Sequence, residues 1–387
     1  MFTYTKFIEL HLIQNFSPAN LNRDDTNNPK DCEFGGHRRA RISSQALKRA
    51  IRYEPVFAQT TQVEIAERSK WMSRPIRNKL MAAGKDEAVA TSVAVSFVNA
   101  YAASSDKKNP EKTNVLVYFS QSEVQSIVDG LLAQWDEAVT ATQKGATLPD
   151  LVKTLQKETK ERTSASDIAL FGRMLAEKTE LNIDAACQVA HAISTHRVNM
   201  EMDFYTAVDD LLERGEILTT EGEEETGAGM MGFTSFNSAC FYRYARIDWR
   251  QLVKNLDDNT ELAQRTVEGF LRATLDAIPT GKQNSFAAQN PTSLAIAVVR
   301  NDGKSWNLAN AFERPVRTDR ETGLIEPSIR ALDTFWGNLT RARDDAEFNV
   351  VAVFTDQYQH ALEHLQPYLQ PTLSSWVKSV NSAVTKE

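Results

Sequence analysis

The densest cluster of residues that could bind a ligand lies in the segment G-G-H-R-R-A-R-I-S-S-Q-A-L-K-R-A-I-R, residues 35–52. It holds six bases and no acidic residue, although the whole chain carries 44 Lys and Arg against 51 Asp and Glu, a net charge of -7. The six bases are Arg38, Arg39, Arg41, Lys48, Arg49 and Arg52. Guanidinium forks, hydroxyls and the free amides of a helix N-terminus all suit phosphate oxygens. The segment therefore predicts a local phosphate-binding surface on an acidic protein.

The second half of this segment has the spacing of an amphipathic helix, which begins after Ser43 or Ser44, since either can cap it. Apolar residues and bases fall on opposite sides: Leu47, Ala50 and Ile51 against Lys48, Arg49 and Arg52. Six phosphate contacts to one strand would give a slope of log K against log salt of about −4. The alternative is a solvated charged helix without a ligand, which is the usual role of a basic run.

Candidate catalytic groups are weaker. Asp24 and Asp25 lie in the preceding loop and, with His37, could hold Mg²⁺ for phosphodiester cleavage. Adjacent carboxylates in an extended loop point to opposite sides, so turn-forming or salt-bridging roles are favoured. His191 and His196 are about 140° apart around a helix and do not form a zinc pair. No P-loop, dinucleotide-binding or nucleophile-elbow motif occurs, and we expect no catalysis, metal or cofactor.

A β-hairpin is the second candidate surface. Residues 197–208 and 233–248 alternate as strands and enclose the tip E-G-E-E-E-T-G-A-G-M-M-G. Phe204 and Tyr205 are adjacent in one arm and face opposite ways, so at least one ring should be exposed and able to stack on a base. The alternative is that both rings pack at the hairpin root. Four acidic residues of the tip would repel a phosphate backbone: Glu221, Glu223, Glu224 and Glu225.

The remaining segments predict an α+β fold that positions these surfaces. A strand is expected over residues 7–13 with Ile8, Leu10 and Leu12 on one face, and it ends at Asn15. Residues 20–36 have loop composition, and residues 60–182 are helical almost throughout, with a capping box at Ser120. A helix through residues 267–278 and a buried strand at 294–299 follow. Strand, helix, strand pair, helix and strand form a ferredoxin-like β-α-β-β-α-β unit, as in RNA-recognition folds.

Composition places the chain among folded proteins of a reducing compartment. Hydrophobic residues make up 42% and charged residues 25% of its 387 residues. Three cysteines lie far apart, which favours a cytoplasmic location. Lys6 and Glu9 interrupt the apolar N-terminus, which we interpret as a strand and not a signal peptide, and no apolar stretch is long enough to span a membrane.

Several motifs carry a resemblance to a known family. They are L-N-R-D-D-T-N-N-P-K-D, F-G-G-H-R-R-A-R-I-S-S-Q-A-L-K-R, L-F-G-R-M, A-H-A-I-S-T-H-R-V, D-F-Y-T-A-V-D-D-L, A-C-F-Y-R-Y-A-R-I-D, G-K-Q-N-S-F-A-A-Q-N-P and L-A-N-A-F-E. In order and over nearly the whole chain, they resemble the CasC-type backbone subunit of the type I-E CRISPR Cascade complex. The longer, Glu- and Gly-rich hairpin tip departs from that family's pattern.

The resemblance implies a hand-like architecture. A ferredoxin-like, RNA-recognition-like palm would comprise residues 1–59, part of 183–248, and 249–387, with a helical finger at 60–182 and a β-hairpin thumb at about 199–240. The alternative is a separate N-terminal domain that ends near residue 180. Copies would stack head to tail along the CRISPR guide RNA, each thumb kinking it, with other Cascade subunits and the target DNA strand paired to the guide as further partners. Sequence specificity would then come from base pairing.

The resemblance also implies which residues contact the guide. Along its backbone would lie Asn22, Arg23, Lys30, Arg38, Arg41, Ser43, Gln45, Lys48 and Arg49. At the kink would lie Phe171, Arg173, Met174, Phe204, Tyr205, Thr206 and Val208. We expect a non-catalytic RNA-binding scaffold. The alternative is metal-dependent RNA cleavage at the Asp24 and Asp25 loop, because related backbone subunits of other CRISPR classes cleave RNA with a loop aspartate.

Overall fold

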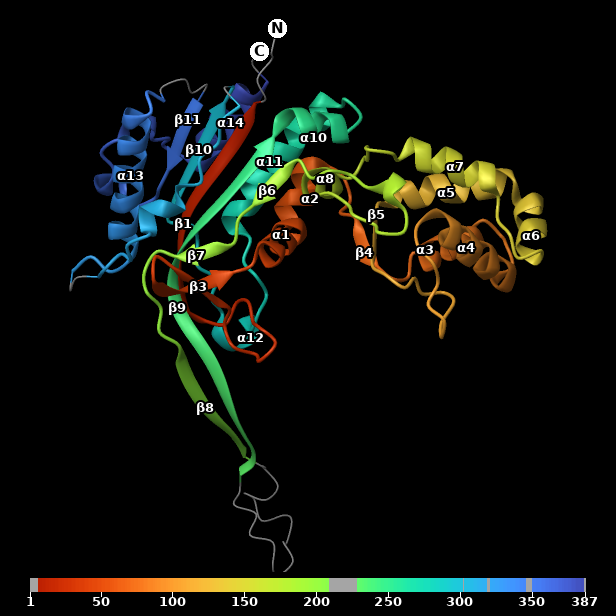
Figure 1. The fold of residues 1–387 in the computed structure, drawn as a ribbon, viewed down its shortest axis with the longest axis horizontal. Helices are drawn as coiled ribbons and strands as arrows, with labels where there is room; N and C mark the ends of the chain where they lie inside the picture. Colours follow the sequence, from red (N-terminus) through yellow and green to blue (C-terminus); the bar gives the residue numbers. More distant parts are fainter. Residues whose placement is uncertain (1–5, 209–227, 302, 319–320, 346–349, 386–387) are drawn as a thin grey trace, which may run out of the picture.

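The protein consists of a sheet covered by helices on both faces, a helical lobe to one side and a long projecting hairpin (Figure 1). This computed structural model describes residues 6–208, 228–301, 303–318, 321–345 and 350–385. The fold is therefore mixed α+β, as predicted. Within these residues, no helix is both long and apolar enough to cross a membrane.

The sheet has nine strands, and its order is β11-β10-β1-β9-β7-β3-β2, with β6 and β8 also paired to β9. All of these neighbours are antiparallel. The strands are β1 (Phe7–Ala19), β2 (Asp31–Phe34), β3 (His37–Ile42), β6 (Cys187–Val189), β7 (Ala192–Ser194), β8 (Glu201–Val208), β9 (Ala228–Asp248), β10 (Leu294–Arg300) and β11 (Val350–Phe354). The expected chain order of strand, helix, strand pair, helix and strand is met by β1, α1, the β6/β7 and β9 strands, α11 and β10.

Helices cover both faces of the sheet. Ile8, Leu10 and Leu12 share one face of β1, as predicted, and pack in the core with α11 and α14. Glu9 and His11 on the other face are also buried, beneath the side covered by α13. Alternation in a central strand therefore does not mean exposure, because both faces of this sheet are covered. The helices of this body are α1 (Ser44–Tyr53), α2 (Pro55–Thr61), α8 (Ser166–Phe171), α10 (Trp249–Asn255), α11 (Thr260–Asp276), α12 (Gln283–Phe286), α13 (Ile325–Ala342) and α14 (Leu373–Val384), with 3-10 turns at Thr179–Leu181, Leu308–Phe312, Gln359–Ala361 and Gln366–Tyr368.

The helical lobe has a hydrophobic core of its own, formed by residues between Met72 and Leu181. Its helices are α3 (Ser73–Ala82), α4 (Glu87–Tyr101), α5 (Gln121–Ala133), α6 (Trp135–Gln143) and α7 (Pro149–Glu158). The capping box between Ser120 and Glu123 is confirmed at the start of α5. The expectation of an almost wholly helical segment is wrong at β4 (Glu67–Ser69) and β5 (Val117–Phe119), which pair where the lobe joins the body (Figure 1).

Buried ion pairs hold the joint between the lobe and the body. Asp167 accepts hydrogen bonds from Nε of Arg52 at 2.9 Å, from the Tyr118 hydroxyl at 2.7 Å and from the Ala66 amide at 3.1 Å. Its carboxylate thus connects α1 and α8 to β5. A second pair, between Arg173 and Glu123 at 2.8 Å, lies at the start of α5. Because an unpaired buried charge is costly, these contacts fix the angle of the lobe.

The predicted loop at residues 20–36 contains a strand, β2, that pairs with β3. Gly35 and Gly36 form the turn between them with φ of 60° and 72°, a conformation that glycine adopts without strain. A Cβ at Gly35 would lie 1.9 Å from the Glu313 carbonyl oxygen. The glycine pair therefore serves a hairpin turn, which packs against the chain at Glu313 through Gly35. The period-2 signal is absent because β2 has only four residues.

The hairpin consists of β8 and the first half of β9. Because β9 is 21 residues long, its second half lies in the sheet beside β1 while its first half extends away from the body (Figure 1). Residues 209–227, which include the four predicted tip glutamates, lie outside the described residues, whereas the end of the predicted tip, residues 228–232, belongs to β9.

Candidate nucleic-acid interface

Helix α1 presents the predicted basic edge. Ser43 caps it, because its hydroxyl accepts a hydrogen bond from the Ala46 amide at 3.3 Å. Leu47 and Ile51 are buried as expected. Gln45 and Arg49 are exposed, and Lys48 is half-buried. The Nζ of Lys48 lies 5.5 Å from the centre of the Phe171 ring, and the Arg49 guanidinium lies 4.8 Å from that of Tyr53.

Two of the six bases do not belong to this surface. Arg52 is buried in its ion pair with Asp167. Arg39 is fully buried and donates to the carbonyl oxygens of Ser194 at 3.1 Å and Phe312 at 2.7 Å. The prediction that all six bases could meet phosphates is therefore wrong, because two guanidinium groups already satisfy groups inside the protein. Four bases remain, which lowers the expected salt slope to about −3.

The other two bases of the surface lie on β3. Arg38 is exposed and forms an ion pair with Asp31. Arg41 donates to the Asp31 carbonyl oxygen at 3.0 Å, and its Nη1 lies 3.0 Å from Nδ1 of His191. Since arginine can only donate, this imidazole nitrogen accepts and is unprotonated. Burial and the nearby charges of Arg41 and Lys30 lower the pKa of His191, which favours the same neutral form.

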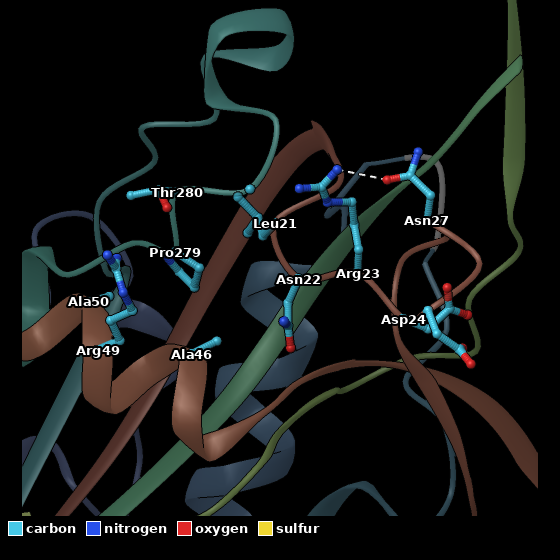
Figure 2. A pocket seen from close by; sticks show the side chains of 12 residues that line it. Leu21, Asn22, Arg23, Asp24, Asn27, Ala46, Arg49, Ala50, Pro279 and Thr280 are labelled. Carbon is cyan, nitrogen blue, oxygen red and sulfur yellow. Dashed lines mark hydrogen bonds between the residues drawn. The ribbon is translucent and has the colours of Figure 1, made fainter. Parts of the chain in front are cut away.

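The loop that carries Asn22, Arg23 and Lys30 lies beside α1. Oδ1 of Asn22 accepts a hydrogen bond from the Ser43 amide at 2.8 Å, so the loop is attached to the start of the helix. The Arg23 guanidinium donates to Oδ1 of Asn27 at 2.7 Å. A cavity of about 430 Å³ lies between this loop, α1 and the segment 279–281. Arg23 and Arg49 line it from different walls (Figure 2). Asp24 and Asp25 also line this cavity, so two guanidinium groups and two carboxylates face it.

The Asp24 carboxylate of this loop is engaged by its own turn. Oδ1 of Asp24 accepts hydrogen bonds from the Thr26 hydroxyl at 2.8 Å and from the amides of Thr26 and Asn28, each at 2.9 Å. These bonds, that of the Thr26 hydroxyl above all, lower the pKa of Asp24. Among the residues that the structure describes, no three His, Cys, Asp or Glu side chains are grouped so that they could hold a metal ion. Asp24 thus closes a turn, the role favoured from the sequence.

The L-F-G-R-M segment is divided between surface and interior. Phe171 and Met174 line a cavity of about 550 Å³ together with Arg68 of β4, Tyr118 of β5 and residues 182–185, and Met174 is 87% exposed. The Arg173 side chain points inward, where it pairs with Glu123 and donates to the Leu181 carbonyl oxygen at 2.7 Å. Its guanidinium is occupied inside the protein, so we leave Arg173 out of the candidate surface. Because Lys48 contacts the Phe171 ring, Phe171 adjoins both this cavity and the basic edge of α1.

The hairpin exposes aromatic rings on its shaft. Phe204 is 53% exposed and Tyr205 42% exposed, so the alternative in which both pack at the root is wrong. Phe204 lies opposite Phe233, which is 71% exposed, with ring centres 5.2 Å apart. Tyr205 lies over Gly232, where a Cβ would be 2.4 Å from Cζ of the ring. Thr206 and Val208 pair through their backbones with β9, but their side chains lie outside the described residues.

Sequence reasoning missed Phe233 and Met202, which are exposed on the same shaft. The sequence does carry a signal for Phe233. The second arm begins F-T-S-F, and its first Phe lies opposite Phe204 when the two arms pair. The root of the hairpin is attached to the basic loop: Oγ of Ser235 donates to Oδ1 of Asn28 at 2.6 Å, and Nδ2 of Asn20 donates to the Ser235 carbonyl oxygen at 2.9 Å. The structure thus joins loop, basic helix and aromatic shaft along one side of the sheet.

Comparisons with known proteins concern the fold of the whole chain. Over 98% of its length, the chain is similar to the whole of a chain in a solved "CRISPR RNA-guided surveillance complex, pre-nicking", with 28% identity and a TM-score of 0.83. A chain of another "CRISPR RNA-guided surveillance complex" matches over 97% of this chain and 99% of its own, with 22% identity and a TM-score of 0.73, which shows a shared fold. No curated protein matches. The family model for CT1975-like protein matches residues 8–378, so the chain belongs to the CT1975-like protein family.

Proposed function

We propose that this protein is a guide-RNA-binding scaffold subunit of a CRISPR RNA-guided surveillance complex. The observation that carries the proposal is the full-length similarity to a chain of such a complex, at 28% identity and a TM-score of 0.83. A guide-binding scaffold needs phosphate contacts and not base recognition, because the guide supplies sequence specificity by base pairing. A local basic surface on an acidic chain meets this need.

The sheet body, the helical lobe and the hairpin would act as palm, finger and thumb. The guide backbone would follow the four bases of β3 and α1 and enter the cavity beside Arg23. Asn22, Lys30, Ser43 and Gln45 line the same path. None of these side chains reads a base edge in this arrangement, so binding should be independent of spacer sequence.

The hairpin would kink the guide. Two paired rings, Phe204 and Phe233, project from a shaft that is anchored to the basic loop through Ser235. A ring exposed in this way can stack on a base or hold two bases apart. Met174 and Phe171 across the 550 Å³ cavity would cover the guide from the lobe side.

Repetition along a guide requires a heterologous interface, in which one patch of a copy contacts a different patch of the next. We propose that copies stack head to tail on the guide, together with other subunits of a Cascade complex of type I-E, and that the target DNA strand pairs with the exposed guide bases. The motif resemblance supports this finer assignment.

The rival function, metal-dependent RNA cleavage at the Asp24 and Asp25 loop, has weaker support. Three hydrogen bonds already engage Oδ1 of Asp24, and a carboxylate held in a turn is poorly placed to bind a metal ion. We therefore propose a non-catalytic role.

Co-expression with a CRISPR RNA array tests the proposal. The purified protein should carry small RNA of uniform length, visible as a high ratio of absorbance at 260 to 280 nm and as one band on a denaturing gel. The variant Lys48→Ala with Arg49→Ala should lose most of that RNA and keep its circular dichroism spectrum. RNA-free wild-type protein would contradict the proposal. Cleavage of complementary RNA in Mg²⁺, abolished by Asp24→Ala, would support the rival.

A further inference from the structure

We propose that one monatomic anion, chloride under ordinary conditions, binds inside the body between the Arg243 guanidinium of β9 and the Thr274 hydroxyl of α11. Both residues line an internal cavity of about 10 Å³. Its other walls are largely apolar and include Leu12 of β1 and Leu47 and Ile51 of α1. The cavity therefore lies on the buried side of α1, where this helix and α11 pack against the sheet (Figure 1).

The partners of Arg243 set it apart from the other buried arginines. Among the residues that the structure describes, the buried arginines are Arg39, Arg52, Arg173, Arg243 and Arg300. Arg52, Arg173 and Arg300 each form an ion pair with a carboxylate, and Arg39 donates to four backbone carbonyl oxygens. Arg243 donates to Oε1 of Gln14 at 2.5 Å, and its Nη2 has no hydrogen-bond partner in the described part of the chain. Its guanidinium is thus the least satisfied of the five.

The Arg243 guanidinium keeps its charge inside the core. Burial lowers the pKa of Arg243 to about 10, which leaves it protonated at neutral pH. A buried charge is costly unless an opposite charge and hydrogen bonds compensate it. Gln14 cannot supply that charge, because its amide is neutral and its Nε2 donates to the Asn290 carbonyl oxygen at 2.8 Å. A negative charge beside Arg243 would therefore stabilise the folded protein.

The Thr274 hydroxyl provides a second donor for the same ligand. A threonine inside a helix can donate to the carbonyl oxygen four residues earlier, as Thr266 of α11 does to Leu262 at 2.7 Å. The buried Thr274 hydroxyl has no such partner among the described residues, although it lies in the same helix. Its proton is therefore available to a ligand in the cavity. A cationic donor and a hydroxyl within apolar walls suit an anion.

The volume of the cavity restricts the kind of anion. A cavity of about 10 Å³ holds one water molecule or one monatomic ion and is too small for phosphate, sulfate or acetate. A water molecule would accept hydrogen bonds from Arg243 and Thr274 but would leave the charge unbalanced. Chloride accepts both bonds and balances the charge. Because the cavity is lined from β9, α11 and α1, the ion would stabilise the packing of the helix that carries the exposed basic residues.

The test measures thermal unfolding of the full-length chain freed of RNA, so that anions cannot act by displacing a guide. Sodium acetate is replaced stepwise by sodium chloride at constant pH and ionic strength, which keeps the screening of surface charges equal. The Tm of the wild-type protein should rise with the logarithm of the chloride concentration, because chloride binds the folded state. Sodium bromide should have the same effect.

Two variants remove the proposed ligands one at a time. Arg243→Met removes the charge and keeps an unbranched side chain, so the chloride-dependent rise in Tm should disappear. Thr274→Val removes only an unpartnered hydroxyl, so the protein should stay folded with a smaller rise. The control is Arg250→Met at an exposed position of α10, which should keep the full rise.

Crystals grown in sodium bromide provide a direct readout. An anomalous peak in contact with Arg243 and Thr274 is expected. Equal Tm values of the wild-type protein in chloride and acetate would overturn the inference, since a water molecule would then satisfy both groups. A full chloride-dependent rise in Arg243→Met would also overturn it, and if that variant does not fold, an undiminished rise in Thr274→Val would do so. None of these outcomes depends on guide binding, so the proposed function is tested separately.

Discussion

Arg49 and Arg52 lie three residues apart on α1 and have opposite roles. Arg49 is exposed beside an open cavity, whereas Arg52 is buried and paired with Asp167. The residue type, the helix and the basic run are the same for both. What differs is the neighbour: α1 passes solvent at Arg49 and meets α8 and the lobe at Arg52. A basic run therefore marks a helix that carries charge, and packing decides which charges bind a ligand and which hold the fold.

Arg39 and Arg173 extend the comparison. Each lies in a motif that the resemblance links to guide binding, and each is turned inward onto carbonyl or carboxylate oxygens. Their partners hold together segments that are far apart in the chain, such as β3 with the turn at Phe312. These arginines support the fold around the proposed guide surface.

The largest effect is expected at the buried end of α1. Asp167→Ala leaves Arg52 buried without its carboxylate and removes the acceptor of the Tyr118 hydroxyl, so the free energy of unfolding should fall by about 3–5 kcal/mol. Arg49→Ala on the same helix should change it by less than about 0.5 kcal/mol. Urea unfolding of the two variants measures the contrast. Equal losses would show that burial does not separate the two arginines.

The aromatic shaft of the hairpin gives the next largest effect. Phe204→Ala with Tyr205→Ala should remove about 1–3 kcal/mol of stacking free energy per base while the contacts of α1 remain. Chemical probing of unpaired guide bases should then lose its periodic pattern. If the pattern persists in this variant, the kink is made elsewhere.

The exposed end of α1 gives a smaller effect that depends on salt. Lys48→Ala with Arg49→Ala should lower the slope of log K against log salt for the guide by about 1.4, equally for all spacers, because two phosphate contacts to a single strand are lost. Titrations at several salt concentrations with two unrelated spacers measure it. A loss confined to one spacer would indicate base recognition instead.

The smallest effect is a pH dependence at the edge of the surface. The pKa of His191 is lowered in the folded protein, so its neutral form is favoured and its share of stability is complete above the unfolded value of about 6.5. That share is lost as the pH falls from this value through the lower pKa of the folded protein. Burial also lowers the pKa of His11 and His196, so these two residues add to the loss of stability at acid pH. His191→Gln should reduce the acid destabilisation slightly between pH 8 and pH 5, and an unchanged unfolding curve would contradict the Arg41 contact.

The local features of the fold could be predicted from the sequence because their signals are local. The face of β1, the cap of α1 at Ser43 and the capping box of α5 each depend on residues within one or two turns. Likewise, the helix expected through residues 267–278 has its signal in local spacing, and Val267 and Phe270 of α11 are buried.

The remaining features depend on partners distant in sequence. Arg39 is buried by carbonyl groups 155 and 273 residues away, which no run of basic residues can reveal. The strands β6 and β7 have three residues each, too few for a period to appear.

A cryo-EM map of the assembled complex with its guide would test the central claim most directly. The account predicts guide phosphates within hydrogen-bond distance of the Lys48, Arg49 and Arg41 side chains in every copy, with the Phe204 ring against a base displaced from the stack. Arg39 and Arg52 should remain on their protein partners. A guide that runs along another face of the sheet, or phosphates bound to Arg52 in place of Asp167, would contradict it.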